Sequence, residues 1–127
     1  MRRSTPGAIT RPGGVTYEVQ AVENTHALLR IYTDEEARKG DHLVYETIVA
    51  RARESGLAGA TVLRGVIGLG STSHMHKAAP FQFARNLPVV VEIVDDIERL
   101  RGFSFKLDDL HDIGLITIEP VEVLRRR

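Results

Sequence analysis

The sequence contains no cysteine, which excludes disulfide bonds, a thiol nucleophile and thiolate metal ligands. It also lacks an excess of charge of either sign, because 17 Lys and Arg residues balance 17 Asp and Glu residues. No bulk charge therefore points to nucleic acid or to a membrane surface. The apolar runs are far shorter than the ~20 residues needed to span a bilayer, and no apolar stretch of a signal peptide follows Met1-Arg2-Arg3. We expect a cytoplasmic protein with no nucleic-acid partner and no membrane insertion.

The 127 residues suit one domain with a single core. Apolar residues make up 43% and charged residues 27%, a composition that excludes a chain disordered throughout. Residues 1–25 are rich in proline and glycine and predict a flexible N-terminal arm, in which weak alternation over Val15–Val22 could add a short strand. From His26 the apolar pattern tightens, and residues 26–127 are predicted to form the folded domain.

Four strands and two helices are predicted in this domain. The first helix is expected to be capped by Asp41 and to end at Gly56, and the second to be capped by Asp95-Asp96. The order strand–helix–strand–strand–helix–strand predicts the α+β ferredoxin-like βαββαβ sandwich, with a long loop over residues 68–86 after the second strand. The four strand segments are Ala27–Tyr32, Thr61–Ile67, Val89–Val94 and Leu115–Ile118.

Side chains alternate between the faces of a strand, so these segments predict two different sheet faces. The wholly apolar face, which the helices should cover, collects Ala27, Leu29, Ile31, Leu63, Ile67, Val89, Val91, Ile93, Ile116 and Ile118. The mixed face collects Leu28, Arg30, Tyr32, Val62, Arg64, Val66, Val90, Glu92, Val94, Leu115, Thr117 and Glu119.

The mixed face predicts self-association, because so extensive an apolar patch is unusual on a monomer. We expect a closed homo-oligomer in which the two arginines and two glutamates of this face pair. Arg30 and Arg64 are both expected within reach of Glu92. The alternative is a monomer whose mixed face is held by cross-strand ion pairs.

The residues after the second strand indicate anion binding. Glycines let backbone N–H groups approach an anion closely, and an arginine can form a bidentate contact with a phosphate or carboxylate. The spacing matches neither a P-loop nor a dinucleotide fingerprint. The alternative is that the glycines only permit tight turns and subunit packing. The candidate ligand-binding residues are Arg64, Gly65, Gly68, Gly70, Lys77 and Arg85.

Two loop histidines, His74 and His76, are separated by one residue. In an extended loop both would point the same way and could hold a divalent metal together with one further ligand. The alternative is a pair of solvated histidines that respond to pH. No enzyme is expected, because the acidic pairs lie near predicted helix starts and the loop serines lack a Gly-x-Ser-x-Gly motif.

Several of these residues together resemble one known family. The run Leu57-Ala58-Gly59-Ala60-Thr61-Val62-Leu63-Arg64-Gly65-Val66-Ile67-Gly68-Leu69-Gly70, followed by His74-Met75-His76, is similar to a family of PII-like proteins long labelled a domain of unknown function. Residues 28–32, 40–45 and 87–96 share the resemblance, which covers roughly residues 26–124. The arm before His26 lies outside it.

The resemblance implies a ferredoxin-like fold assembled as a homotrimer. It also implies that the loop after the second strand is a signalling loop, and that a nucleotide binds between subunits near the base of that loop. An adenine nucleotide is the candidate ligand, and the loop would regulate a partner protein such as a transporter or metabolic enzyme. The loop has no tyrosine for PII-type uridylylation. Two alternatives stay open, a divalent-metal trimer of the CutA type that uses His74 and His76, and a protein-interaction module without a ligand.

Overall fold

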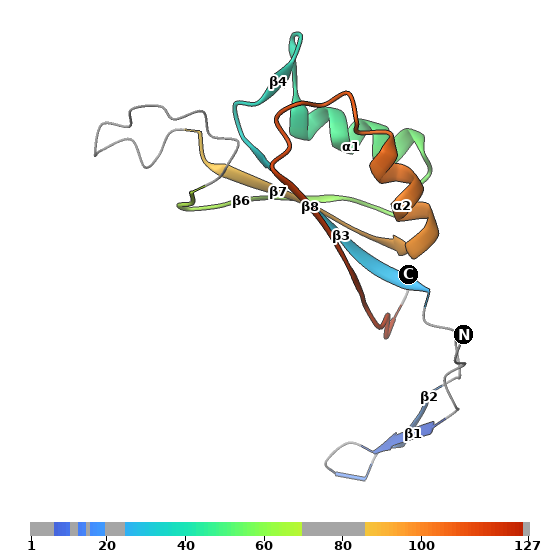
Figure 1. Ribbon diagram of the computed structural model, residues 1–127. Coiled ribbons are helices and arrows are strands. Elements are labelled where there is room, and N and C mark those ends of the chain that lie inside the picture. Colours follow the sequence, from blue (N-terminus) through green and yellow to red (C-terminus); the bar gives the residue numbers. More distant parts are fainter. Residues whose placement is uncertain (1–6, 11–12, 15, 20–24, 70–85, 126–127) are drawn as a thin grey trace.

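The computed structural model describes residues 7–10, 13–14, 16–19, 25–69 and 86–125. Two helices lie on one face of a four-stranded antiparallel sheet whose strand order is β6-β7-β3-β8 (Figure 1). This arrangement confirms the predicted α+β ferredoxin-like fold. Its elements are β3 (His26–Asp34), α1 (Val44–Glu54), β6 (Thr61–Arg64), β7 (Pro88–Asp96), α2 (Ile97–Phe105) and β8 (Leu115–Pro120).

Two pairs of short strands accompany the main sheet. β1 (Gly7–Thr10) pairs with β2 (Thr16–Val19), so the weak alternation in the arm does form a strand. The flexibility of residues 1–25 stays a prediction. β4 (Arg38–Lys39) pairs with β5 (His42–Leu43) in the connection that leads to α1.

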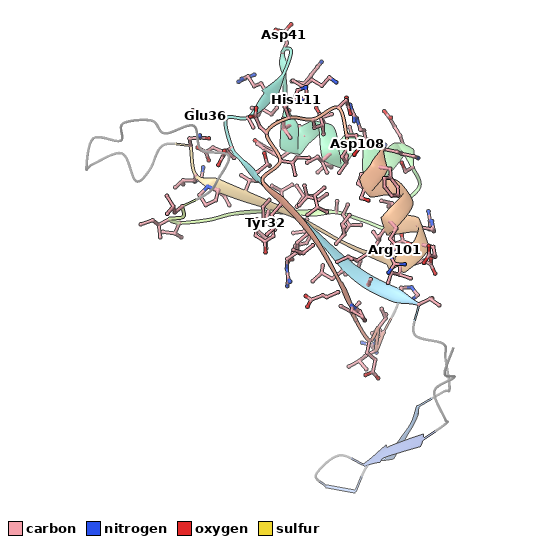
Figure 2. All side chains as sticks on the ribbon, in the orientation of Figure 1. Tyr32, Glu36, Asp41, Arg101, Asp108 and His111 are labelled. Atoms are coloured by element: carbon pink, nitrogen blue, oxygen red, sulfur yellow. The ribbon has the colours of Figure 1, made fainter. Side chains whose placement is uncertain are left out.

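The β4–β5 hairpin explains why the predicted Asp41 cap is wrong. Gly40 adopts a φ of 60° at the turn, and the Asp41 carbonyl accepts a hydrogen bond from Arg38 Nη1 at 3.3 Å. Figure 2 shows Asp41 at the tip of this hairpin, away from the helix. The residue that precedes α1 is Leu43, which makes no side-chain capping bond.

The other predicted helix signals are confirmed. Gly56 follows α1 with a φ of 72°, the left-handed conformation that glycine tolerates best. Asp96 caps α2, because its side chain accepts from the backbone N–H groups of Glu98 and Arg99 at 3.0 and 3.3 Å.

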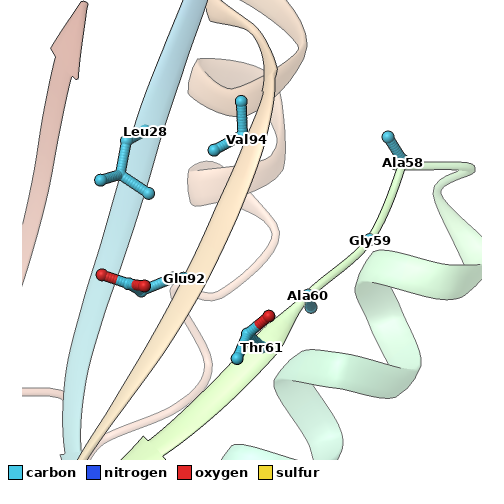
Figure 3. Close-up of a pocket in the computed structure, with 7 residues that line it drawn as sticks. All are labelled: Leu28, Ala58, Gly59, Ala60, Thr61, Glu92 and Val94. Carbon is cyan, nitrogen blue, oxygen red and sulfur yellow. The ribbon is translucent and has the colours of Figure 1, made fainter. Parts of the chain in front are cut away.

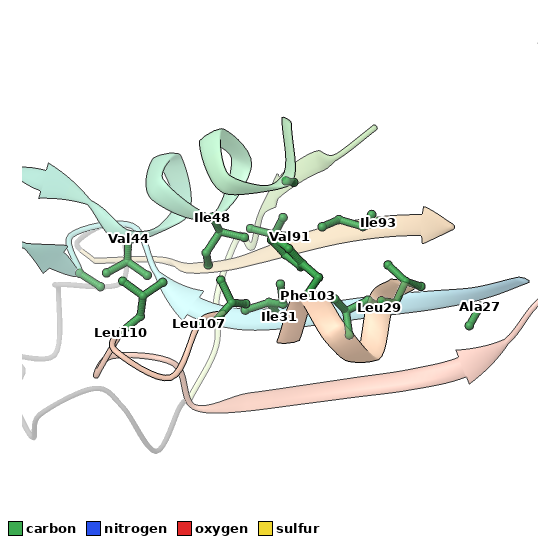
Figure 4. Packing of buried hydrophobic residues seen from close by; sticks show 13 residues of the cluster. Ala27, Leu29, Ile31, Val44, Ile48, Val91, Ile93, Phe103, Leu107 and Leu110 are labelled. Atoms are coloured by element: carbon green, nitrogen blue, oxygen red, sulfur yellow. The ribbon is translucent and has the colours of Figure 1, made fainter. Parts of the chain in front are cut away.

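The core lies between the helices and the covered sheet face (Figure 4). β3 and β7 are nine residues long and alternate over most of their length between buried and more accessible positions, as strands with one covered face should. Phe103 is the largest side chain buried there. The strand and helix residues buried in this cluster are Ala27, Leu29, Ile31, Val44, Ile48, Ala52, Val91, Ile93, Leu100 and Phe103.

The predicted faces of the second strand are inverted. Val62 pairs with Val91 and Leu63 pairs with Val90, and Val91 is buried under the helices. Directly paired residues share a face, so Val62 and Arg64 lie on the helix side, whereas Leu63 lies on the opposite side. The strand also ends at Arg64, so Ile67 lies beyond it and is 67% exposed. We call the side of the sheet away from the helices the open face.

Candidate functional site

The structure describes three of the six predicted ligand-binding residues. Arg64, Gly65 and Gly68 lie together at the end of β6, beside the start of β7. The remaining predicted residues lie outside the described part of the chain; these are Gly70, Lys77 and Arg85, and the alternative metal ligands His74 and His76.

The two described glycines pack against one proline. A Cβ atom on Gly65 would lie 2.7 Å from Pro88 Cγ, and one on Gly68 would lie 2.6 Å from the same atom. Neither glycine adopts a left-handed φ. The Gly65 N–H donates to the Pro88 carbonyl at 2.7 Å, which joins the two chain segments directly. Glycine at these two positions therefore allows the chain after β6 to pass close to Pro88.

The chain returns to the sheet through a second set of hydrogen bonds. Asn86 adopts a φ of 49°, and its Oδ1 accepts from the backbone N–H of Glu36 at 3.1 Å. The Glu35 N–H donates to the Leu87 carbonyl at 2.9 Å. The end of the connection that rejoins β7 is thus held beside the turn that follows β3, and Gly65 at its other end is held to Pro88. We call this group, residues 35–36, 64–68 and 86–88, the loop base.

Arg64 is the positively charged side chain of the loop base. Its Nη1 lies 3.3 Å from Glu35 Oε2, and 66% of its side chain is exposed. The predicted pairing with Glu92 is wrong, because Arg64 projects from the helix side of β6 and Glu92 lies on the open face. Exposed ion pairs contribute only about 0–1 kcal/mol, so an anion with better geometry can displace Glu35.

The open face carries the other predicted ion pairs. Arg30 Nε lies 3.0 Å from Glu92 Oε2, and Arg30 Nη1 lies 2.6 Å from Glu119 Oε1. The hydrogen bond with Glu92, followed by that with Glu119, raises the pKa of the Arg30 guanidinium above its ordinary value. The predicted cross-strand pairing at Arg30 is therefore confirmed.

Apolar side chains surround this charged centre. Leu28, Tyr32 and Val90 are partly buried. No helix or strand in the described part of the chain covers the open face (Figure 1). The most exposed apolar residues on it are Leu63, Val94 and Leu115, at 48%, 42% and 54%. The face therefore combines the exposed apolar area and ordered charges of a contact surface.

A pocket of about 400 Å³ opens beside β6 and β7 (Figure 3). Sequence reasoning missed it, although the small residues just before β6 were a usable signal, since they leave space beside the neighbouring strand. The pocket is lined by Leu28, Ala58, Gly59, Ala60, Thr61, Glu92 and Val94.

A buried carboxylate fixes one wall of this pocket. Asp95 is 1% exposed, and its Oδ2 accepts from the backbone N–H of Ala58 at 2.9 Å. Its Oδ1 accepts from the Asp96 N–H at 2.7 Å and from Arg99 Nη1 at 3.1 Å. Arg99 Nη2 in turn donates to the Gly56 carbonyl at 2.7 Å. These bonds anchor the α1–β6 connection to the start of α2.

The comparisons with known proteins identify the family. Residues 26–123 match DUF190, described as Uncharacterized ACR, COG1993. The chain belongs to the DUF190 family. This DUF190 chain is 43% identical over 97 residues to a UPF0166 protein of Aquifex aeolicus (strain VF5). The aligned region covers 76% of this chain and 91% of the relative.

Two further relatives match the DUF190 chain over a similar length. A second UPF0166 protein of Aquifex aeolicus is 32% identical over 96 residues, covering 76% of this chain and 94% of the relative. UPF0166 protein MJ1524 of Methanocaldococcus jannaschii is 31% identical over 99 residues, covering 77% of this chain and 91% of the relative.

The described residues also bear on the metal hypothesis and on membrane insertion. Within them, no group of three or more His, Cys, Asp or Glu side chains could hold a metal ion. The metal hypothesis therefore rests on the two loop histidines, which lie outside that part of the chain. Among the helices that the structure describes, none is long and apolar enough to cross a membrane.

Proposed function

We propose that this DUF190 chain is a PII-like regulatory protein and not an enzyme. In this proposal it assembles as a homotrimer, binds a small anionic ligand between subunits, and uses the loop between β6 and β7 to regulate a partner protein. An adenine nucleotide is the candidate ligand, and a transporter or a metabolic enzyme is the candidate partner. The observation that carries the proposal is the loop base, where both ends of the loop are held around an exposed, weakly paired arginine.

The open face supports the assembly. Its exposed leucines and valine would lose contact with water against a second copy, at roughly 25 cal/mol for each Å² of apolar surface buried. Arg30 already has two carboxylate partners within its own chain, so its charge is compensated before the face is covered. A paired charge costs much less to bury than an isolated one.

The loop base supports a link between the ligand and the loop. A phosphate that attracts Arg64 would take it from Glu35. The backbone of Glu35 is bonded to Leu87, and that of the next residue is bonded to Asn86. A shift of this turn would therefore reach the residues where the loop rejoins the sheet. A ligand that prefers one arrangement of these groups would shift the population of loop conformations.

Thermal unfolding with AMP, ADP, ATP and inorganic phosphate tests the ligand. A ligand at ~100-fold excess over its Kd stabilises the folded protein by about 2.7 kcal/mol, which is readily measured. The Arg64→Ala variant should lose most of this stabilisation. Arg101→Ala is the matched control, because Arg101 is also an exposed arginine with one carboxylate partner, Glu98 Oε1 at 3.1 Å.

The outcomes separate the hypotheses. Normal nucleotide binding by Arg64→Ala contradicts the role given to that side chain. If the anions have no effect and zinc raises the melting temperature, the divalent-metal trimer replaces the proposal, provided that His74→Ala with His76→Ala removes the zinc effect. If neither anions nor metals have an effect, a ligand-free interaction module replaces it. Light scattering that gives only a monomer refutes the trimer.

A further inference from the structure

We propose that the β1–β2 hairpin of the N-terminal arm docks on the free edge of β8 in the same chain and extends the main sheet. The structure shows the hairpin apart from that sheet (Figure 1). The docking surface is the β8 edge together with residues 121–124, which follow it. The hairpin lies outside the residues that match DUF190, and neither the ligand nor the trimer of the proposed function is needed for this contact.

The hairpin has one apolar face that needs a cover. Directly paired residues share a face, and neighbours along a strand alternate between faces. The register therefore gathers Ile9, Tyr17 and Val19 on one face. An isolated two-stranded hairpin is at best marginally stable in water, so this hairpin gains stability by burying that face. The opposite face collects the small or polar residues Ala8, Thr10, Thr16 and Glu18.

β8 offers a matching edge. It pairs with β3 on one side, and in the described part of the chain no strand pairs with its other side. Ile116 pairs with Ile31, which is buried under the helices, yet Ile116 itself is 38% exposed. Beyond the strand, Val123 and Leu124 are 38% and 85% exposed. An edge strand with exposed apolar residues is a template on which a further strand can pair.

The arm joins the sheet beside this edge. The Thr25 carbonyl accepts a hydrogen bond from the Ile97 N–H at 2.6 Å, and the His26 carbonyl accepts one from the Val121 N–H at 3.1 Å. The root of the arm is therefore fixed next to the end of β8. Residues 20–25 can span up to roughly 20 Å, whereas a strand added beside β8 lies two strand spacings, about 10 Å, from β3. The connection is thus long enough for docking within one chain.

Docking on β8 brings like faces together. A strand beside β8 continues both sides of the sheet, so the apolar face of the hairpin joins Ile116 on the helix side. Its polar face then joins Thr117, which pairs with Arg30 on the open face. Backbone hydrogen bonds to the free edge supply the affinity in this kind of strand addition. The other edge of the sheet lies farther from the root of the arm, because β7 and β6 separate it from β3.

Cysteine cross-linking tests the contact, because the chain has no cysteine of its own. Glu18→Cys is combined with Thr117→Cys in one chain and oxidised, and Thr16→Cys with Thr117→Cys is made as well, since a shift of two residues keeps the same face. Docking predicts a disulfide within the chain in at least one of these variants. Glu18→Cys with Leu63→Cys is the matched control, because Leu63 lies on the same side of the sheet but on its other edge strand.

Two cross-linking results would overturn the inference. Disulfide formation with Thr117 no greater than with Leu63 means that the hairpin has no preference for the β8 edge. Disulfides that join two chains, seen as dimers on a non-reducing gel, mean that the hairpin docks on a neighbouring copy and not on its own chain.

Amide hydrogen exchange gives an independent readout that needs no cysteine. Tyr17→Asp places a charge on the apolar face of the hairpin, and the β8 N–H groups that do not bond to β3 should then exchange roughly tenfold faster than in wild type. Thr16→Asp is the matched control, because it places the same charge on the polar face one residue away, and it should leave the exchange unchanged. Equal exchange in the wild type and both variants contradicts the docking.

These results are distinguishable from failure of the proposed function. A chain that is monomeric, or that binds none of the anions, contradicts the proposed function and leaves the docking intact if the disulfide to Thr117 still forms. A trimer that binds a nucleotide but shows neither the disulfide nor the exchange difference overturns the docking alone.

Discussion

Substituting Gly65 by alanine tests whether the loop base depends on close packing against Pro88. The added Cβ would lie 2.7 Å from Pro88 Cγ and 3.4 Å from the Pro88 carbonyl oxygen. The proline ring is rigid and belongs to the first residue of β7, so it cannot rotate away as a flexible side chain would. Either β7 or the chain after β6 must move, and the Gly65–Pro88 hydrogen bond must lengthen.

The size of the effect follows from comparison with Gly59→Ala. Both substitutions gain about 0.4–1 kcal/mol because alanine restricts the unfolded chain more than glycine does. A Cβ at Gly59 meets no atom within 4 Å, so only Gly65→Ala suffers the overlap. Overpacking of this kind costs typically about 1–3 kcal/mol. We therefore expect Gly65→Ala to be about 1–3 kcal/mol less stable than Gly59→Ala.

Urea unfolding measures this difference. All variants are compared at one fixed protein concentration, because the stability of the proposed trimer would depend on concentration. Pro88→Ala removes the Cγ atom that the new Cβ would meet, so Gly65→Ala should cost less in that background. A coupling free energy of about 1 kcal/mol is expected for residues in such contact. Equal stability of Gly65→Ala and Gly59→Ala, or an unchanged cost in the Pro88→Ala background, would refute the reasoning.

Three further substitutions test the roles of Asp95, Asp96 and Asp109. Asp95→Ala should lower the free energy of unfolding by about 2–4 kcal/mol in urea titration, because it leaves buried N–H donors without their acceptor. Asp96→Ala removes the side-chain cap of α2 and should cost about 1 kcal/mol in the same assay. A hydrogen bond from Arg51, and to a lesser degree one from Lys39, holds the pKa of the Asp109 carboxyl well below its usual range. A lowered folded-state pKa stabilises the protein above the unfolded-state pKa of about 3.9, and this contribution is lost as the pH falls below it. Thermal melts below about pH 5 should therefore be less pH-dependent in Asp109→Asn than in wild type.

Each of these predictions has a contrary result. A cost for Asp95→Ala no larger than that for Asp96→Ala would mean that the buried carboxylate is not the main anchor of the pocket wall. An Asp96→Ala variant with unchanged stability would contradict the capping role. An unchanged acid response in Asp109→Asn would assign the acid sensitivity to other carboxylates.

The order of elements and most of the covered face could be predicted because the signals are local. The alternation of β3 and β7 reports which side of each strand is buried, since both lie in the middle of the sheet with a neighbour on each side. Gly56 and Asp96 mark helix boundaries through their own conformation or hydrogen bonds. The Asp41 prediction was wrong because the backbone of this residue is engaged in a hairpin turn that the polar sequence did not reveal.

The candidate site was predicted less completely. Arg64 and the glycines of the loop base were identified as residue types suited to anions, but their neighbours could not be. Glu35, which pairs with Arg64, lies 29 residues earlier in the chain, and Pro88 packs on Gly65 across the whole loop. Contacts between segments so far apart leave no periodic signal in the sequence.

By itself, the sequence determined the fold class, the helix boundaries at Gly56 and Asp96, and the paired charges at Arg30. Only the tertiary structure decided the orientation of β6 and the partner of Arg64. The physical reason is that β6 is a short edge strand with every residue exposed, so its own pattern does not report a buried side. Its register against β7 sets its faces, and a shift of one residue moves every side chain to the other side.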